Sequence, residues 1–309
     1  MKRELHHVSR FTFHVSRVEV QAILLLALSA IVHSGWNLLA KRSLDKQVFL
    51  WLALVAAIII FFVPFWYLYR PIPAEGWVFI GISGALEAVY FAFLGSAYQD
   101  GALSLVYPLA RGSAPLFVAL FAFAALGEGI VAGGIAGILL VVAGIYTLHL
   151  KSLGREGLAH ALAAPLLSLR DKTSQLAVLV GLTIASYSVI DKVGVSYVNP
   201  LLYLYLVFLV AALALAPYML LARREAVATE WRENRASIVA VAVMFTAAFV
   251  PVLLALTISR VSYVAPVREM SVVFAALLGT LALREPFGRT KIVGSVLIFA
   301  GIVFIALAR

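Results

Sequence analysis

The sequence predicts an all-α integral membrane protein with ten transmembrane helices arranged as two inverted five-helix repeats. The first observation behind this prediction is the composition: 63% of the 309 residues are hydrophobic and 13% are charged, with a mean hydropathy of +1.03. Soluble domains contain about 25% charged residues. In lipid a backbone must satisfy its own hydrogen bonds, and long uninterrupted apolar runs do so as helices.

The second observation is an internal repeat. Shifting the sequence by 157 positions aligns chemically distinctive residues with their own kind. The aligned pairs are Arg111 with Arg268, Glu128 with Glu285, Gly137 with Gly294, and Gly144 with Gly301. A repeat of this kind in an apolar chain is typical of transporters, whose binding sites form where two related halves meet.

Ten apolar segments define the predicted helices. A helix needs about 20 apolar residues to cross a hydrocarbon core of roughly 30 Å. In the first half we expect spans at 20–40, 47–69, 77–98, 102–126 and 129–150. In the second half we expect them at 173–190, 193–222, 236–259, 261–283 and 292–308. Five crossings per half turn the second copy upside down, which makes the repeat an inverted one.

The spans divide the chain into four segments. Residues 20–150 form the first repeat and residues 173–309 form the second. Between them, residues 151–172 have charged ends around an apolar middle that is too short to cross a bilayer, and we interpret them as an interfacial linker helix. Residues 1–19 form a basic tail without the apolar run of a signal peptide. Either this tail lies at the membrane surface, or translation truly starts close to its end.

Charge and motifs exclude several classes of function. The net charge of +9 comes from basic residues scattered among the predicted loops, so it does not indicate nucleic-acid binding. The chain has no cysteine, which excludes disulfides and thiolate metal sites. It also lacks the phosphate-binding Gly-x-x-x-x-Gly-Lys, the metal-binding His-Glu-x-x-His and the nucleophile motif Gly-x-Ser-x-Gly. We therefore expect no cofactor, no metal and no enzymatic activity.

The two sides of the membrane differ in their basic residues. Outside the spans, eight Lys and Arg residues lie on the side of the N-terminus and fourteen lie on the opposite side. Cytoplasmic loops normally carry the excess of Lys and Arg. The charge distribution therefore favours an N-terminus outside the cytoplasm.

Four charged residues within the predicted spans mark the candidate substrate site. Glu87 and Arg111 lie about nine or ten residues into adjacent spans, which is roughly 15 Å deep at 1.5 Å per residue. Arg268 and Glu269 reach a similar depth in the second half. A charge at mid-bilayer costs about 2.5–3.5 kcal/mol on insertion scales, so each one needs a partner or a water-lined cavity.

Two interpretations of these charges stay open. Either the four residues bind substrate between the halves, or Glu87 and Arg111 form a structural pair that joins two helices. On a continuous helix Arg268 and Glu269 would point about 100° apart, so they would not both face one cavity centrally. Glu87 is also a candidate carrier of a coupling proton, although an arginine paired with it would favour the ionised form and so oppose that role.

Aromatic and polar neighbours extend the candidate site. Tyr90 shares a helical face with Glu87, and Tyr107 shares one with Arg111. We expect both tyrosines to line the cavity beside the charges. The alternative is that these aromatic stripes only pack the core.

The first span of each half contributes further candidates. His33 and Asn37 share a helical face with Trp36 adjacent, and at an offset of 151 Trp36 aligns with Tyr187. We expect all four residues to line the cavity, although a lone membrane histidine is often only a hydrogen bond between helices. No second His or carboxylate stands at metal-ligand spacing.

Other distinctive residues are expected to be structural. Glu128 and Glu285 lie where helices end, and we expect them to fix the adjoining turns. Asp191 and Lys192 are expected at the membrane interface, with the lysine reaching to water. The repeated glycines allow close approach of helices, either within the bundle or in a homodimer.

Short motifs at the ends of the spans resemble a known family. They are Trp36-Asn37 near the end of the first span, Gly-Ala-Leu-Ser at 101–104, Gly127-Glu128, and the Gly-x6-Gly pairs of the fifth and tenth spans. In this layout, over about residues 20–308, the chain resembles the EamA-like branch of the drug/metabolite transporter superfamily.

The resemblance implies a ten-helix carrier that works by alternating access, often as an exporter of amino acids or other small metabolites and commonly driven by protons. It also implies a cytoplasmic N-terminus and basic residues after the second span. This chain instead concentrates its basic residues after the first and seventh spans. Either its orientation or its direction of transport therefore departs from the family pattern.

We predict a secondary active transporter that exports small polar metabolites, such as amino acids or small anions, across a bacterial inner membrane. Its expected partners are a small-molecule substrate, the lipid bilayer and protons. Two alternatives are a lipid flippase of the same superfamily, which needs a laterally open groove, and a membrane-embedded enzyme, which needs a nucleophile or metal cluster.

Overall fold

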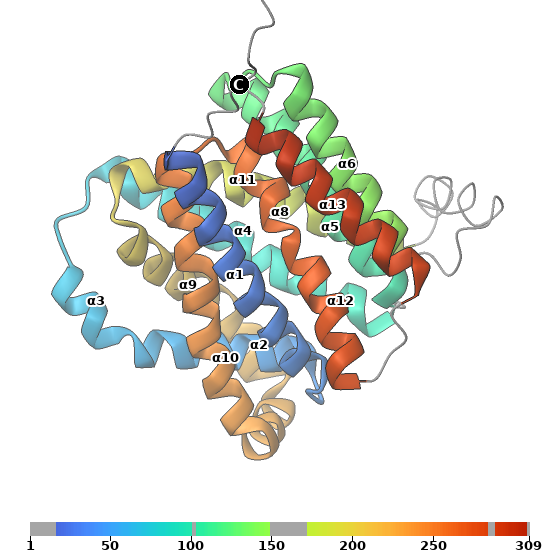
Figure 1. The fold of residues 1–309 in the computed structure, drawn as a ribbon. Coiled ribbons are helices and arrows are strands. Elements are labelled where there is room, and N and C mark those ends of the chain that lie inside the picture. The colour runs from blue at the N-terminus through green and yellow to red at the C-terminus, as the bar shows by residue number, and fades with distance from the viewer. Residues whose placement is uncertain (1–16, 101–102, 149–171, 284–287, 308–309) are drawn as a thin grey trace, which may run out of the picture.

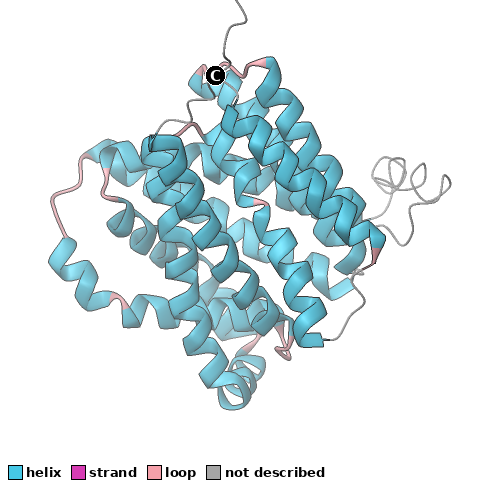
Figure 2. Ribbon diagram, viewed as in Figure 1, coloured by secondary structure: helices cyan, strands magenta, loops and turns pink. Residues whose placement is uncertain are grey.

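The computed structural model describes residues 17–100, 103–148, 172–283 and 288–307. Throughout this part of the chain the regular elements are helices, and it contains no strand (Figure 2). The predicted tail lies outside the described residues up to residue 16, and so does the predicted linker apart from Lys172.

The helices follow the predicted order (Figure 1). In the first half they are α1 (Arg17–Lys41), α2 (Lys46–Ile60), α3 (Phe62–Leu68), α4 (Ala74–Asp100), α5 (Leu103–Leu126) and α6 (Ala132–Leu148). In the second half they are α8 (Lys172–Tyr197), α9 (Pro200–Pro217), the π-helical η2 (Tyr218–Ala222), α10 (Arg224–Ile258), α11 (Val261–Arg268), α12 (Met270–Leu283) and α13 (Arg289–Leu307).

Local signals explain where several helices begin. The Asp45 side chain accepts hydrogen bonds from the N–H groups of Gln47 and Val48, both at 3.1 Å, and so caps α2. Asn199 caps α9 in the same way, and Pro200 follows at the first helical position, where its missing N–H costs nothing.

The predicted span 47–69 is bent. Its two parts, α2 and α3, differ in direction by 52°. Pro64 lies in the first turn of α3 and lacks the N–H that would bond to the Ile60 carbonyl, and Phe61 at the junction has φ −93° and ψ 9°. As a result α3 leaves the line of α2 and lies at the edge of the bundle (Figure 1).

The helices are long and apolar enough for a membrane. Among the described residues, eight helices can cross by length and composition, and the bent pair α2–α3 would make a ninth. The apolar helix α6 is shorter, with 17 residues. The all-helical membrane fold is therefore confirmed, whereas the count of ten spans stays a prediction.

The packing of α6 on α13 follows the sequence repeat. A Cβ added to Gly144 would lie 2.7 Å from the Gly294 carbonyl oxygen, and one added to Gly137 would lie 2.7 Å from the Gly301 carbonyl oxygen. As the numbering rises along α6, it falls along α13, so these repeat-related helices pack antiparallel (Figure 1). The same glycine faces are used reciprocally, as an inverted repeat requires.

Contacts between the halves obey the same symmetry. α1 packs against α10 and α12 of the second half, and its counterpart α8 packs against α4 and α5 of the first half. α2 packs on α10 as α9 packs on α4. Each half therefore uses its first helix to contact the other half, and the core lies along these interfaces.

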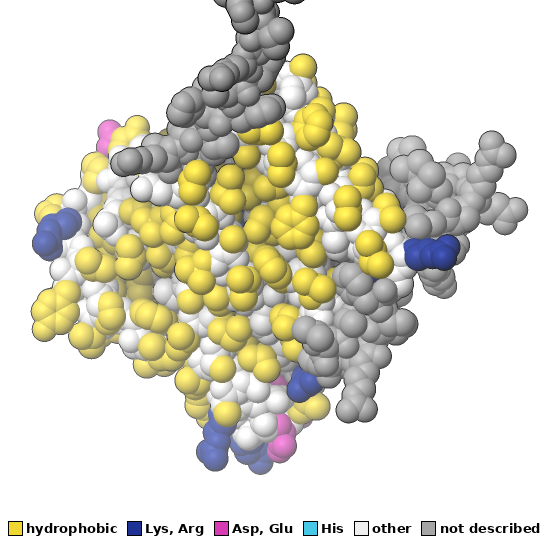
Figure 3. All heavy atoms as spheres, viewed as in Figure 1, with side chains coloured by type: hydrophobic (Ala, Val, Ile, Leu, Met, Phe, Trp, Pro, Cys, Tyr) yellow, Lys and Arg dark blue, Asp and Glu magenta, His cyan; other side chains and the backbone are white. Residues whose placement is uncertain are grey.

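The outer surface is apolar over a broad face. Figure 3 shows hydrophobic side chains covering the face of the molecule nearest the viewer, with Lys, Arg, Asp and Glu gathered toward its edges and its lower end. Leu24, Leu28 and Ile31, all exposed, form an outward stripe on α1 at helical spacing. A surface of this kind is suited to lipid rather than water.

Candidate functional site

A break between α11 and α12 places two charged residues in the interior. α11 ends at Arg268, and α12 begins at Met270, so Glu269 alone separates the two helices. Pro266 precedes the break, and the Glu269 N–H donates to the Pro266 carbonyl at 3.1 Å instead of continuing the α-helical pattern. Both Arg268 and Glu269 are buried at this break.

Arg111 on α5 meets groups from both halves. Its Nη1 lies 3.2 Å from Glu269 Oε1, with the two side chains 6% and 3% exposed. Its Nη2 contacts His33 Nε2 on α1. The predicted structural pair of Arg111 with Glu87 is therefore wrong: the carboxylate that Arg111 binds comes from the other half of the chain.

The residues on α1 support this contact. Trp36 Nε1 donates to His33 Nδ1 at 3.2 Å, and Asn37 Nδ2 donates to the His33 carbonyl at 2.8 Å. The Trp36 ring packs edge-on against Phe245 of α10 at 4.9 Å between centroids. His33 and Trp36 are buried, so the imidazole is held on one side by an indole and on the other by a guanidinium.

Arg268 is held by aromatic rings rather than by a carboxylate. Its guanidinium lies over the Phe249 ring, 5.2 Å from the centroid, which is a cation–π geometry. Tyr187 on α8 lies close enough to interact with it. The Nε atom of Arg268 is buried and has no hydrogen-bond partner. The Oε2 atom of Glu269 is also buried and has none.

Two of the predicted residues on α4 face this cluster. Tyr90 packs edge-on against Tyr187, with 5.9 Å between ring centroids, and Glu87 lies one turn earlier on the same helix. Glu87, Tyr90 and Tyr187 are all buried. Tyr107, which was also predicted to line the site, lies on α5, but its side chain is outside the described part of the structure.

A small hollow opens beside Arg111. Its volume is about 260 Å³. Residues from α1, α4, α5 and α8 line it: Asn37, Tyr90, Leu94, Ala110, Arg111, Val180 and Ile184.

Several polar residues were missed by the sequence analysis. Asp191 was expected at the membrane interface, but it is buried and accepts hydrogen bonds from Ser83 and Tyr203. The available signal was its position one helical turn after Tyr187, which places both on one face of α8. Lys192 does lie near a helix end, where its Nζ donates to the Leu256 carbonyl at 2.5 Å.

Glu128 has a structural role, as its position predicts, but the helix that it caps belongs to the second half of the chain. The N–H groups of Val261 and Ser262 both donate to its carboxylate at 3.1 Å, so Glu128 caps the first turn of α11. Gly127, at φ 65°, supplies the left-handed turn that ends α5, and the Glu128 N–H donates to the Ala122 carbonyl at 3.1 Å. Its repeat partner, Glu285, lies outside the described residues.

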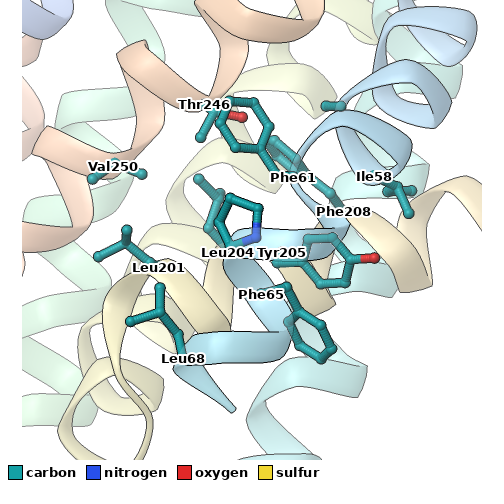
Figure 4. A pocket seen from close by; sticks show the side chains of 12 residues that line it. Ile58, Phe61, Phe65, Leu68, Leu201, Leu204, Tyr205, Phe208, Thr246 and Val250 are labelled. Carbon is teal, nitrogen blue, oxygen red and sulfur yellow. The ribbon is translucent and has the colours of Figure 1, made fainter.

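A separate apolar groove of about 430 Å³ lies at the edge of the bundle. In Figure 4, Phe61 and Phe65 from the bent α2–α3 region lie next to Leu204 and Tyr205 of α9, and Thr246 of α10 lies close by. The Phe65 and Tyr205 rings stack at 4.2 Å between centroids. The lining is almost entirely hydrophobic, so the groove suits an alkyl chain and not a charged metabolite.

The described residues contain no group of three or more His, Cys, Asp or Glu side chains that could hold a metal ion.

Comparison with known proteins covers both halves. A family model described as the EamA-like transporter family matches residues 20–150 and again residues 172–307. A comparison with curated proteins finds no match. Among solved structures 29 chains match, and one of them, a crystal structure described only as that of a protein, has a TM-score of 0.64 and 18% identity. The match covers 94% of this chain and 95% of that one, and at such low identity it supports the fold alone.

Proposed function

Because this chain belongs to the EamA-like transporter family, we propose that it is a secondary active transporter that exports small polar metabolites across a bacterial inner membrane by alternating access coupled to protons. Membership itself makes the chain a membrane transporter of the drug/metabolite superfamily. Members of this family are transporters rather than enzymes, and they act on small molecules within a lipid bilayer. The substrate class, the direction and the coupling ion are the proposed parts.

The observation that supports the substrate site most strongly is the environment of Arg268. Its guanidinium is buried, is held over Phe249, and keeps an Nε without a hydrogen-bond partner. A buried charged group that keeps an unsatisfied donor is costly unless a ligand supplies the acceptor. Purely structural pairing accounts for Arg111 with Glu269, but it does not account for Arg268.

The origin of these groups supports alternating access. Arg111 and His33 come from the first half, whereas Arg268 and Glu269 come from the second half at a helix break. Inverted-repeat carriers bind substrate at such an interface, and broken helices provide its polar groups. Movement of one half against the other would remake these contacts on either side of the membrane.

The chemistry of the cluster supports a small anion or a zwitterion such as an amino acid. Two arginines offer donors to a carboxylate or a similar anionic group. Glu87 offers an acceptor within the same buried region, on the helix that also contributes Tyr90. A small hollow beside Arg111 adjoins this cluster.

A thermal-shift screen tests this function. Purified protein in detergent is heated with amino acids, carboxylates and phosphorylated metabolites, and Arg268→Gln is compared with the matched control Arg232→Gln, whose arginine is exposed on α10. A ligand at 100 times its Kd stabilises the native state by about 2.7 kcal/mol. We expect one ligand class to stabilise the wild type and Arg232→Gln but not Arg268→Gln.

Two other results would change the proposal. Equal stabilisation of wild type and Arg268→Gln would show that the arginine does not bind substrate. Stabilisation by phospholipids alone would favour the alternative function, a lipid flippase, which the apolar groove lined by Phe65 and Tyr205 supports.

A further inference from the structure

A second group of buried polar side chains lies between α4, α8 and α9. Asp191 Oδ1 accepts hydrogen bonds from Ser83 Oγ at 2.5 Å and from the Tyr203 hydroxyl at 3.0 Å. Gly194 makes room for the Tyr203 ring, because a Cβ there would lie within 2.6 Å of its Cζ and hydroxyl oxygen. Three helices therefore fix one carboxylate inside the membrane-spanning bundle.

Glu87 faces this group from one helical turn along α4. It lies four residues after Ser83, so the two side chains share a face of the helix. The Glu87 side chain is 2% exposed, and its buried Oε2 has no hydrogen-bond partner. Because Ser83 donates to Asp191, the Asp191 carboxylate lies against the same face of α4 as Glu87.

The two carboxylates have different surroundings. Two hydroxyl groups donate to Asp191, and such donors stabilise the ionised form. None of the described hydrogen bonds is donated to Glu87 Oε2. Two ionised carboxylates buried against the same face of one helix repel each other, and a proton on one of them relieves the repulsion. The proton therefore belongs on Glu87.

Charged and titratable side chains on the surrounding helices determine the electrostatic environment of Glu87 and Asp191. The charged or titratable ones are Tyr90 on α4, Tyr187 and Asp191 on α8, Tyr203 on α9, Arg111 on α5 and Arg268 on α11. The buried face of α2 is apolar. On α10 the buried carboxylate is Glu230, which is engaged elsewhere by the Asp45 N–H. Lys192 points away, donating to the Leu256 and Ser259 carbonyls.

We propose that Glu87, with Asp191 as its partner, is a proton-binding site of this transporter, distinct from the Arg111–Glu269 pair. The inference rests on the proposed function and gives the coupling proton a place in the fold. Protonation adds one hydrogen to Glu87 Oε2 and removes one negative charge from the buried pair. The Asp191, Ser83 and Tyr203 group lies toward the C-terminal end of α8.

Arg268 links this site to the substrate. Arg268 is buried in the neighbouring cluster, and an anionic group of the substrate bound there changes the charge around Glu87, so substrate binding and proton binding are coupled.

Infrared spectroscopy tests the site without a substrate. The carboxylic acid C=O band of the full-length protein in detergent is recorded over a pH series, in water and in D2O. The variants are Glu87→Gln, Asp191→Asn and the control Glu75→Gln, whose carboxylate is exposed at the start of α4. We expect a buried carboxylic acid band in wild type and Glu75→Gln that disappears as pH rises and is lost in Glu87→Gln.

Asp191→Asn tests the partnership. Removing the neighbouring negative charge should change the pH midpoint of the band. The proposal is overturned if the band titrates unchanged in Glu87→Gln, if Asp191→Asn does not move the midpoint, or if added sodium at fixed pH abolishes the band. A failure of the ligand screen would overturn the substrate site and leave this result standing.

Discussion

At the scale of single residues, Arg111 joins three helices. It lies on α5, binds Glu269 between α11 and α12, and contacts His33 on α1. Removing two charges from water is expensive, so a buried pair of this kind contributes less to stability than to the choice of one arrangement. Breaking the pair is a different matter, because it leaves one charge buried without its partner.

A double-mutant cycle measures this dependence. We expect Arg111→Gln and Glu269→Gln each to lower the free energy of unfolding by about 3–5 kcal/mol, because each strands a buried charge. The double variant should be more stable than the sum of the single losses predicts, by about 0.5–3 kcal/mol. Unfolding in mixed micelles gives all three values.

The exposed neighbours Arg232 and Glu233 on α10 provide a control cycle. Their Gln variants should be additive. Additivity at Arg111 and Glu269 as well would contradict the buried ion pair.

At the scale of elements, close contacts between backbones hold the two halves together. On α6, Gly144 faces the Gly294 carbonyl and the Ile298 N–H group of α13. Backbone atoms inside helices cannot move aside individually as flexible side chains can. The four repeated glycines of α6 and α13 therefore pack against each other within one chain. This packing gives no support to the alternative use of these glycines in a homodimer.

Gly144→Ala should separate these helices. Its Cβ would lie 2.7 Å from the Gly294 carbonyl oxygen and 2.8 Å from the Ile298 nitrogen, so the helices must shift. We expect a loss of about 1–3 kcal/mol, as for other overpacked cores. The measurement is the midpoint of thermal unfolding in detergent.

Gly81→Ala on α4 is the matched control, because nothing lies within 4 Å of a Cβ at that position. It should be neutral, or stabilising by up to about 1 kcal/mol through higher helix propensity. Equal effects of the two substitutions would count against the close approach of α6 and α13.

At the scale of the whole molecule, polar contacts lie at both ends of the bundle. At one end Arg223 pairs with Asp45, and the buried Glu230 accepts from the Asp45 N–H at 2.8 Å. Figure 3 shows basic side chains gathered at this lower end. At the other end Glu128 caps α11, and Lys192 binds the last turn of α10. The basic end is the one that the charge rule assigns to the cytoplasm.

Cysteine labelling tests that orientation. The chain has no cysteine, so a single introduced thiol reports one position. Thr229 and Ser196 are exposed: Thr229 lies near the start of α10, and Ser196 lies beside the helix end that contacts the far end of α10. In intact cells a membrane-impermeant maleimide should label Ser196→Cys but not Thr229→Cys. The reverse pattern would show that the N-terminus is cytoplasmic, as the family resemblance implies.

Much of this fold follows from local properties of the sequence. Apolar runs long enough to cross a bilayer predict the helices, because the backbone has no other way to satisfy its hydrogen bonds in lipid. Pro64 marks the bend between α2 and α3, and the repeat of Arg111 and Arg268 predicts two related halves. The cost of burying charge also marked Glu87, Arg111, Arg268 and Glu269 as residues that need partners.

The identity of those partners depended on tertiary structure. Sequence spacing suggested Glu87 for Arg111, since their helices are consecutive, but the carboxylate beside Arg111 is Glu269, 158 positions away. Asp191 was assigned to the interface by its distance from the end of a span, yet Ser83 and Tyr203 hold it inside. Helical periodicity and burial cost act along one segment, so the sequence alone determined which side chains must be satisfied. Which groups satisfy them is decided by how distant helices pack, and that geometry exists only in the folded chain.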